Sequence, residues 1–219
     1  MNVEPVLLEV ADHGPLPGLL IRPPDAVACY VFAHGAGAGM EHAFMAECAV
    51  ELARLGLATL RYQFPYMHRG SRRPDRPDVC HATVRAAVRF ASELRPVLPL
   101  VAGGKSFGGR MTSQAQASGA LPAVRGLAFL GFPLHPPKKP SDARAKHLHD
   151  VTVPMLFLQG TRDELASLDL LRPLVERLAP RASLQLAEGA DHSFHVPVRS
   201  GRTDAEVRSE MLRALRTGT

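Results

Sequence analysis

Short apolar runs alternate with segments of helical period from residue 27 onward. The run at residues 28–33 is fully apolar and predicts a buried strand. Residues 43–55 carry apolar side chains at helical spacing, and this pattern stops at Gly56. Alternation of this kind is typical of βα units around a mainly parallel sheet. The pattern therefore predicts an α/β fold.

The same reading extends along the whole chain. Two early apolar runs flank Asp12-His13-Gly14-Pro15 and predict a hairpin of two edge strands, whereas proline-rich residues 65–78 and 133–150 predict loops. Because no repeat, linker or change of composition divides the sequence, we expect a single domain over residues 1–219. The expected strands are residues 6–10, 16–21, 28–33, 57–62, 98–102, 126–132, 153–159 and 182–186, and the expected helices are residues 43–55, 79–94, 110–117, 168–178 and 204–215.

The composition is that of a folded protein, and the charge balance weighs against a nucleic-acid partner. The chain has 219 residues, of which 46% are apolar, and this is enough for a full hydrophobic core. Twenty-six basic residues against 21 acidic ones give a net charge of +5, and the only dense basic stretch is residues 69–76 (RGSRRPDR). A dedicated nucleic-acid binder concentrates more charge on one face, so we expect no nucleic-acid partner.

Cysteine spacing and the amino-terminal segment bear on the compartment. Cys29, Cys48 and Cys80 lie far apart and form no C-x-x-C pair, so we expect neither a zinc site nor a disulfide framework. The first residues lack the basic and apolar regions of a signal peptide, and no apolar run reaches the length of a membrane span. We therefore expect a cytoplasmic protein with no membrane partner.

The peptide G-K-S-F-G at residues 104–108 places Ser106 between two glycines. A predicted strand precedes this peptide and a predicted helix follows it, which is the setting that a nucleophile elbow requires. The turn strains the serine backbone, and a Cβ at either flanking glycine would collide with the adjoining strand or helix. The pattern indicates a serine hydroxyl presented at the edge of the sheet; the alternative is a serine that only caps the helix.

A serine hydroxyl needs a base, and the base needs a third group to orient it. Asp163 follows the predicted strand at residues 153–159, and His192 lies in the turn after the next strand. Both therefore belong at the same sheet edge as Ser106. Glu164 and Asp169 are close enough in sequence to compete with Asp163 for the third role.

Four segments together resemble a known family. They are residues 33–39 (AHGAGAG), 104–109 (GKSFGG), 160–163 (GTRD) and 189–192 (GADH), and they are similar to the serine α/β-hydrolases over nearly the whole chain. Within that superfamily the chain resembles the small dienelactone-hydrolase-like enzymes. The best-known members of that subgroup use a cysteine where this chain has Ser106. The resemblance implies the α/β-hydrolase fold, a three-layer sandwich with a mostly parallel sheet, an N-terminal antiparallel hairpin and no large cap domain.

The resemblance also implies a site. Ser106, Asp163 and His192 would form the catalytic triad, and the backbone N–H groups of Ala36 and Phe107 would form the oxyanion hole. No cofactor or metal is implied. The expected activity is cleavage of a small carboxylic ester or thioester through an acyl-enzyme, by a monomer or homodimer.

Other interpretations stay open at this stage. The fold could serve as a catalytically silent binding or scaffold protein, or the same triad could act as a peptidase or lactonase. The arginines of residues 69–76 either bind an anionic group of the substrate or belong to a solvated loop. A further hypothesis is that they bind nucleic acid. Lys105 is expected to be solvated or paired at the rim of the site, with the steering of anionic substrates as its alternative. His34 is expected to pack or to stabilise a turn, with a second base as its alternative.

Overall fold

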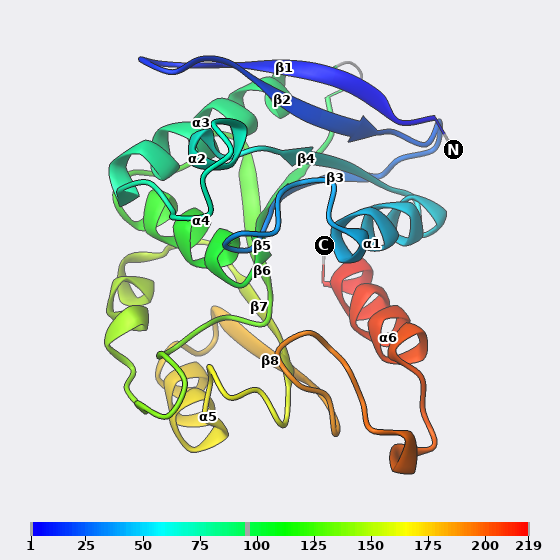
Figure 1. Ribbon diagram of the computed structural model, residues 1–219, viewed down its shortest axis with the longest axis vertical. Helices are drawn as coiled ribbons and strands as arrows, with labels where there is room; N and C mark the ends of the chain where they lie inside the picture. The colour runs from blue at the N-terminus through cyan, green and yellow to red at the C-terminus, as the bar shows by residue number, and fades with distance from the viewer. Residues whose placement is uncertain (1, 95–96, 219) are drawn as a thin grey trace.

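A computed structural model describes residues 2–94 and 97–218 (Figure 1). Residues 1, 95, 96 and 219 belong to the predicted domain 1–219 but lie outside the described residues. The strands are β1 (Glu4–Val10), β2 (Gly14–Ile21), β3 (Ala28–Ala33), β4 (Leu57–Tyr62), β5 (Leu100–Lys105), β6 (Val124–Leu130), β7 (Met155–Gly160) and β8 (Ala182–Ala187). The helices are α1 (Ala43–Arg54), α2 (Pro65–His68), α3 (Pro77–Glu93), α4 (Phe107–Ala117), α5 (Leu168–Arg177) and α6 (Asp204–Thr217), with 3-10 helices η1 (Ala143–Asp150) and η2 (Val198–Ser200).

All eight strands form one sheet in the order β1-β2-β4-β3-β5-β6-β7-β8. The strands from β3 to β8 are parallel to one another, while β1 pairs with β2 and β2 with β4 in antiparallel fashion. This arrangement confirms the predicted mostly parallel sheet with an N-terminal hairpin. The expectation of two edge strands in the hairpin was wrong, because residues 18–21 of β2 pair with β4 and only β1 remains at the edge.

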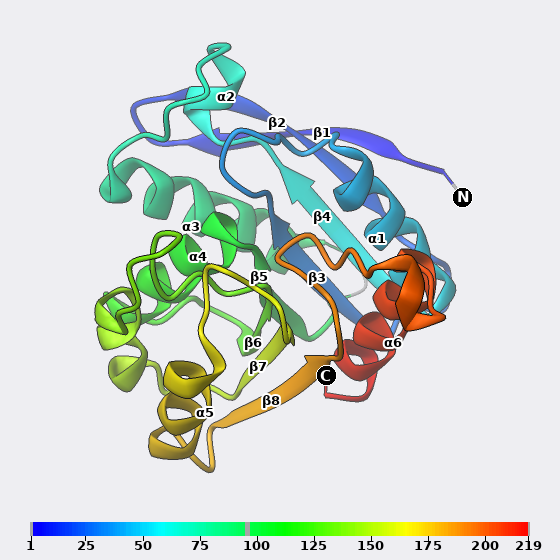
Figure 2. The same ribbon diagram turned by 60° about the horizontal axis from the view of Figure 1, so that its bottom comes forward.

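Helices cover both faces of the sheet, and each face has its own core (Figures 1 and 2). On one face, α1 and α6 pack through residues such as Leu52 and Met211 against Tyr30 and Phe32 of β3. On the other face, α3, α4 and α5 share a larger core that includes Phe129 and Phe157. Every residue of β3 and β4 is buried, and burial on both faces explains why β3 is an apolar run rather than an alternating one.

Two helices begin inside residues 65–78, where the sequence predicted a loop. Pro65 is the first residue of α2 and Pro77 is the first residue of α3. A proline at the first helical position costs no hydrogen bond, because the N–H group there has no partner within the helix. Two of the three prolines that indicated a loop therefore start helices.

The carboxyl edge of the sheet carries no large additional domain in the described part of the chain. The connection from β6 to β7 contains η1, a 3-10 helix of eight residues that packs beside α4. This agrees with the predicted absence of a cap domain. None of the described helices combines the length and the apolar character that crossing a bilayer requires.

Candidate active site

Ser106 occupies a strained turn between β5 and α4. Its φ of 50° and ψ of −115° are unusual for a residue with a side chain. A Cβ added at Gly104 would lie 2.4 Å from the Ala33 carbonyl oxygen, and one added at Gly108 would lie 2.6 Å from the same atom. Both glycines are therefore required for α4 to start this close to the end of β3.

The hydroxyl of Ser106 begins a chain of two hydrogen bonds. Ser106 Oγ lies 2.8 Å from His192 Nε2, and His192 Nδ1 lies 2.7 Å from Asp163 Oδ2. Because a carboxylate only accepts, Nδ1 carries the proton and Nε2 is left to accept the Ser106 hydroxyl proton. The Asp163 side chain is fully buried, whereas that of His192 is 24% exposed. The structure thus brings together three residues that follow β5, β7 and β8.

A buried glutamine, which the sequence analysis overlooked, holds the Asp163 carboxylate in place. Gln159 Nε2 donates to Asp163 Oδ2 over 2.5 Å, and Gln159 Oε1 accepts the Phe132 N–H at 2.9 Å. The Leu165 N–H donates to Asp163 Oδ1 at 2.8 Å. An amide within the otherwise apolar end of β7 was the available signal, since a buried polar side chain needs partners.

A cavity of about 580 Å³ lies beside Ser106 and His192. Small and apolar residues from the loop after β3 and from the start of α1 contribute to its wall, together with charged residues such as Lys105 and Arg208. The described residues that line it are Gly35, Ala36, Ala38, His42, Ala43, Phe44, Met45, Glu47, Lys105, Ser106, Leu165, His192, Ser193, Asp204 and Arg208. Ala36 therefore lines the same cavity as the serine hydroxyl, and Phe107 is the first residue of α4.

Polar side chains from β4 and the start of α2 hold the backbone of the loop that contains Ala36. Gln63 Oε1 accepts the Met40 N–H at 2.9 Å, and Arg61 Nη1 donates to the Met40 carbonyl at 3.1 Å. The Gly37 N–H donates to the Tyr66 hydroxyl at 3.3 Å. These contacts hold the loop at Gly37 and at Met40.

His34 stabilises the same loop and is not a second base. Its Nδ1 donates to the Gly35 carbonyl at 2.7 Å, and its Nε2 accepts the Phe64 N–H at 3.1 Å. One neutral tautomer satisfies both contacts, and burial lowers the pKa of His34 to about 4. The predicted turn-stabilising role agrees with these contacts.

A second serine–histidine pair lies on the α3–α5 face of the sheet. Ser113 Oγ lies 2.8 Å from His147 Nε2 and also donates to the Arg110 carbonyl at 2.9 Å. Because the hydroxyl has one proton, His147 must donate to Ser113 rather than accept from it. Burial, and then the charge of Arg110, lower the pKa of His147 to about 4. This pair therefore holds η1 against α4.

Two of the four arginines in residues 69–76 bind carboxylates close in sequence. Arg69 pairs with Asp75 at 2.6 Å, and Arg76 pairs with Asp78 at 2.5 Å. In the part of the chain that the structure describes, none of residues 69–76 lines the cavity beside Ser106. These contacts favour the solvated-loop interpretation.

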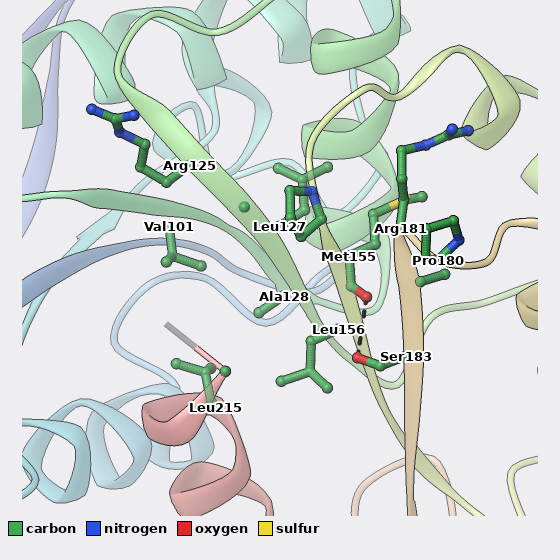
Figure 3. A pocket seen from close by; sticks show the side chains of 14 residues that line it. Val101, Arg125, Leu127, Ala128, Met155, Leu156, Pro180, Arg181, Ser183 and Leu215 are labelled. Carbon is green, nitrogen blue, oxygen red and sulfur yellow. Dashed lines mark hydrogen bonds between the residues drawn. The ribbon is translucent and has the colours of Figure 1, made fainter.

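Another cavity, of about 280 Å³, lies at the opposite edge of the sheet (Figure 3). Its wall includes residues from the first positions of β6, β7 and β8, such as Met155 and Ser183. Arg125 and Arg181 lie on its rim, and Figure 3 shows their guanidinium groups extending away from each other. Ligands of open parallel sheets bind at the carboxyl ends of strands, so the cavity at Ser106 is the candidate active site.

Comparison with known proteins identifies the fold and the family. The chain resembles a serine hydrolase homologue from Coxiella burnetii (22% identity, 98% of both chains covered, TM-score 0.77). It also resembles a serine hydrolase without lid from Xanthomonas campestris (21%, 99% and 95%, 0.76) and a dienelactone hydrolase from Anabaena variabilis (21%, 97% of both chains, 0.73). These likenesses confirm the predicted fold. Since the model of the alpha/beta hydrolase domain family matches residues 26–217, the chain belongs to that family.

Proposed function

We propose that this hydrolase cleaves small carboxylic esters or thioesters and that Ser106, His192 and Asp163 are its catalytic triad. The observation that carries the proposal is the continuous hydrogen-bond chain from the Ser106 hydroxyl to the buried Asp163 carboxylate. A nucleophile, a base and a group that orients the base stand in the order that nucleophilic catalysis requires. We also propose that residues 1–219 act as one domain on a small-molecule substrate.

Acylation would begin when Ser106 Oγ attacks the carbonyl carbon of the substrate and passes its proton to His192 Nε2. The carbonyl oxygen becomes an oxyanion, which the N–H groups of Ala36 and Phe107 would stabilise. The fixed loop around Ala36 and the first turn of α4 supply these donors without reorganisation. His192 then protonates the leaving alcohol or thiol, and Asp163 stabilises the imidazolium meanwhile.

Deacylation repeats these steps with water as the nucleophile. His192 Nε2 removes a proton from water, the hydroxide attacks the acyl-enzyme, and the proton returns to Ser106 Oγ as the acid leaves. The open, cap-less site supports a compact acyl group. Each buried methylene contributes about 0.8 kcal/mol, and we expect kcat/KM to stop rising at about six carbons, where further methylenes stay in water.

A panel of activated substrates tests the proposal. We expect a fluorophosphonate probe to label Ser106, and p-nitrophenyl esters or thioesters of two to six carbons to be hydrolysed. An unlabelled Ser106 would favour the silent scaffold instead. If Ser106 is labelled but the enzyme hydrolyses only peptides or lactones, the proposed triad stands and the proposed substrate class is wrong.

A further inference from the structure

Lys105 lies next to Ser106 in sequence and reaches the loop that carries His192. It is the last residue of β5, is half-buried, and lines the cavity beside the serine. Its Nζ donates to the main-chain carbonyl oxygen of His192 over 2.5 Å. The side chain, predicted to be solvated or paired at the rim, is thus paired, and it links two segments of the proposed active site.

Two aromatic rings form the surroundings of the ammonium group. Lys105 Nζ lies 5.8 Å from the ring centroid of Phe44 and 5.6 Å from that of Phe194. The two rings stack on each other with centroids 6.0 Å apart and an angle of 12° between their planes. Cations are attracted to aromatic faces at such distances, so the rings keep the ammonium beside the His192 carbonyl.

The loop around His192 is built to present that carbonyl. Asp191 Oδ1 accepts the N–H groups of Ser193 at 2.8 Å and His195 at 3.0 Å, which closes a tight turn. Phe194 has a φ of 62°, a left-handed conformation that residues with side chains rarely adopt. The Phe194 ring of this strained turn lies beneath the Lys105 ammonium group.

Gly131 leaves the space in which Lys105 and His192 meet. A Cβ added at Gly131 would lie 3.0 Å from Lys105 Nζ and 3.3 Å from both Cε1 and Nδ1 of His192. Within the described residues, no carboxylate lies within ion-pair distance of Lys105 Nζ. Among the described residues, the hydrogen-bond partner of this ammonium is therefore the His192 carbonyl, while Asp163 and Asp191 act on it from beyond ion-pair distance. Burial lowers the pKa of Lys105 to about 8, as expected for an ammonium shielded from water.

We propose that Lys105 is a positioning residue for His192: its bond to the His192 carbonyl holds the imidazole within hydrogen-bond reach of Ser106. This inference rests on the proposed triad. The donor, Lys105, directly precedes Ser106, and the acceptor is the main chain of His192 itself. The bond therefore limits the movement of His192 relative to Ser106. A displacement of about 1 Å at such a site can lower a rate about 100-fold.

Lysine NMR tests the link in the unaltered protein. The sequence has four lysines, and Lys138, Lys139 and Lys146 are exposed. With ¹⁵N-lysine labelling near pH 6, we expect one ammonium signal, that of Lys105, to exchange its protons with water much more slowly than the other three. Equal exchange of all four signals would overturn the proposal.

Kinetics of Lys105→Met test its consequence, because methionine retains an unbranched apolar side chain but has no donor. We expect kcat for p-nitrophenyl acetate and the rate of fluorophosphonate labelling to fall about 100-fold, with KM nearly unchanged and circular dichroism preserved. Lys139→Met, an exposed control, should match the wild type. Labelling of Lys105→Met at the wild-type rate would overturn the inference.

Two further results separate the possible failures. If Lys105→Met does not fold, Lys105→Arg replaces it: retention of kcat within about 10-fold supports the donor role, and a loss of about 100-fold contradicts it. If wild-type Ser106 does not react with the fluorophosphonate, the proposed function fails and the inference fails with it. If the fluorophosphonate labels both the wild type and Lys105→Met at the same rate, the inference about Lys105 fails while the proposed function stands.

Discussion

The pair Ser106–His192 and the pair Ser113–His147 have the same separation, 2.8 Å between hydroxyl oxygen and Nε2. They differ in the partners behind them. Asp163 accepts from His192 Nδ1, so Nε2 is free to accept the Ser106 proton, whereas Ser113 already donates its proton to Arg110. The direction of the proton and the presence of a third group, rather than the distance, therefore distinguish the proposed nucleophile from a structural contact.

The largest expected effect separates the two pairs. Ser106→Ala and His192→Ala should each lower kcat for an activated ester about 10⁵- to 10⁶-fold, and the double variant should lose little more, because the triad acts as a unit. Ser113→Ala removes the same hydroxyl from the other pair and should leave kcat within about 3-fold of wild type. Steady-state kinetics of the four proteins measures this difference, and comparable losses for Ser106→Ala and Ser113→Ala would contradict it.

Asp163→Asn tests the group behind the histidine. An amide can stabilise the wrong imidazole tautomer, and we expect a loss in kcat of about 10⁴-fold, the magnitude known for the equivalent change in a serine protease. Glu164→Gln and Asp169→Asn are the matched controls and should retain activity. A large loss of kcat in either control, with Asp163→Asn still active, would show that Asp163 is not the group that orients His192.

Gln159→Leu tests the residue behind Asp163, one hydrogen bond further from Ser106. It removes a donor to Asp163 and leaves the Phe132 N–H without its acceptor, so we expect kcat to fall about 10-fold and stability to drop by about 1–3 kcal/mol. The control is Gln116→Leu, because Gln116 is also buried and accepts the Leu121 N–H away from the site. Urea unfolding should show similar losses in both variants, while an equal loss of kcat in Gln116→Leu would remove the special role of Gln159.

The smallest expected effect concerns the second pair and appears in stability rather than in kcat. His147 has a folded-state pKa of about 4, below its ordinary value of 6.5, so the unfolded chain binds more protons between these values. The contribution of His147 to the free energy of unfolding is therefore complete above pH 6.5 and is lost as the pH falls toward 4. In His147→Asn the decline in unfolding free energy from pH 7 to pH 4.5 should be smaller by about 1 kcal/mol, a value reduced for partial exposure. Urea titrations at both pH values test this, and parallel declines would refute it.

The sequence by itself determined the sheet architecture and indicated the three positions of the proposed triad. Alternating apolar runs and helical segments predict βα units because strands buried on both faces and amphipathic helices each leave a local pattern. Ser106, Asp163 and His192 were recognisable because each follows a predicted strand, and the carboxyl ends of parallel strands meet at one edge. The glycines at 104 and 108 added a local steric reason for the turn.

Tertiary structure alone decided the contacts around those positions. The pairing of β2 with β4, the amide of Gln159 against Asp163 and the link from Lys105 to His192 join residues from separate elements. For the lysine before Ser106 the sequence left a solvated or a rim-paired side chain open, because lysine is rarely buried. Its actual environment depends on Phe44 of α1 and Phe194 of a distant loop, which become neighbours only when both pack on the same face of the sheet. Hydrophobic period and turn chemistry are properties of neighbouring residues, whereas the partner of a buried polar group depends on which distant segments the folded sheet brings together.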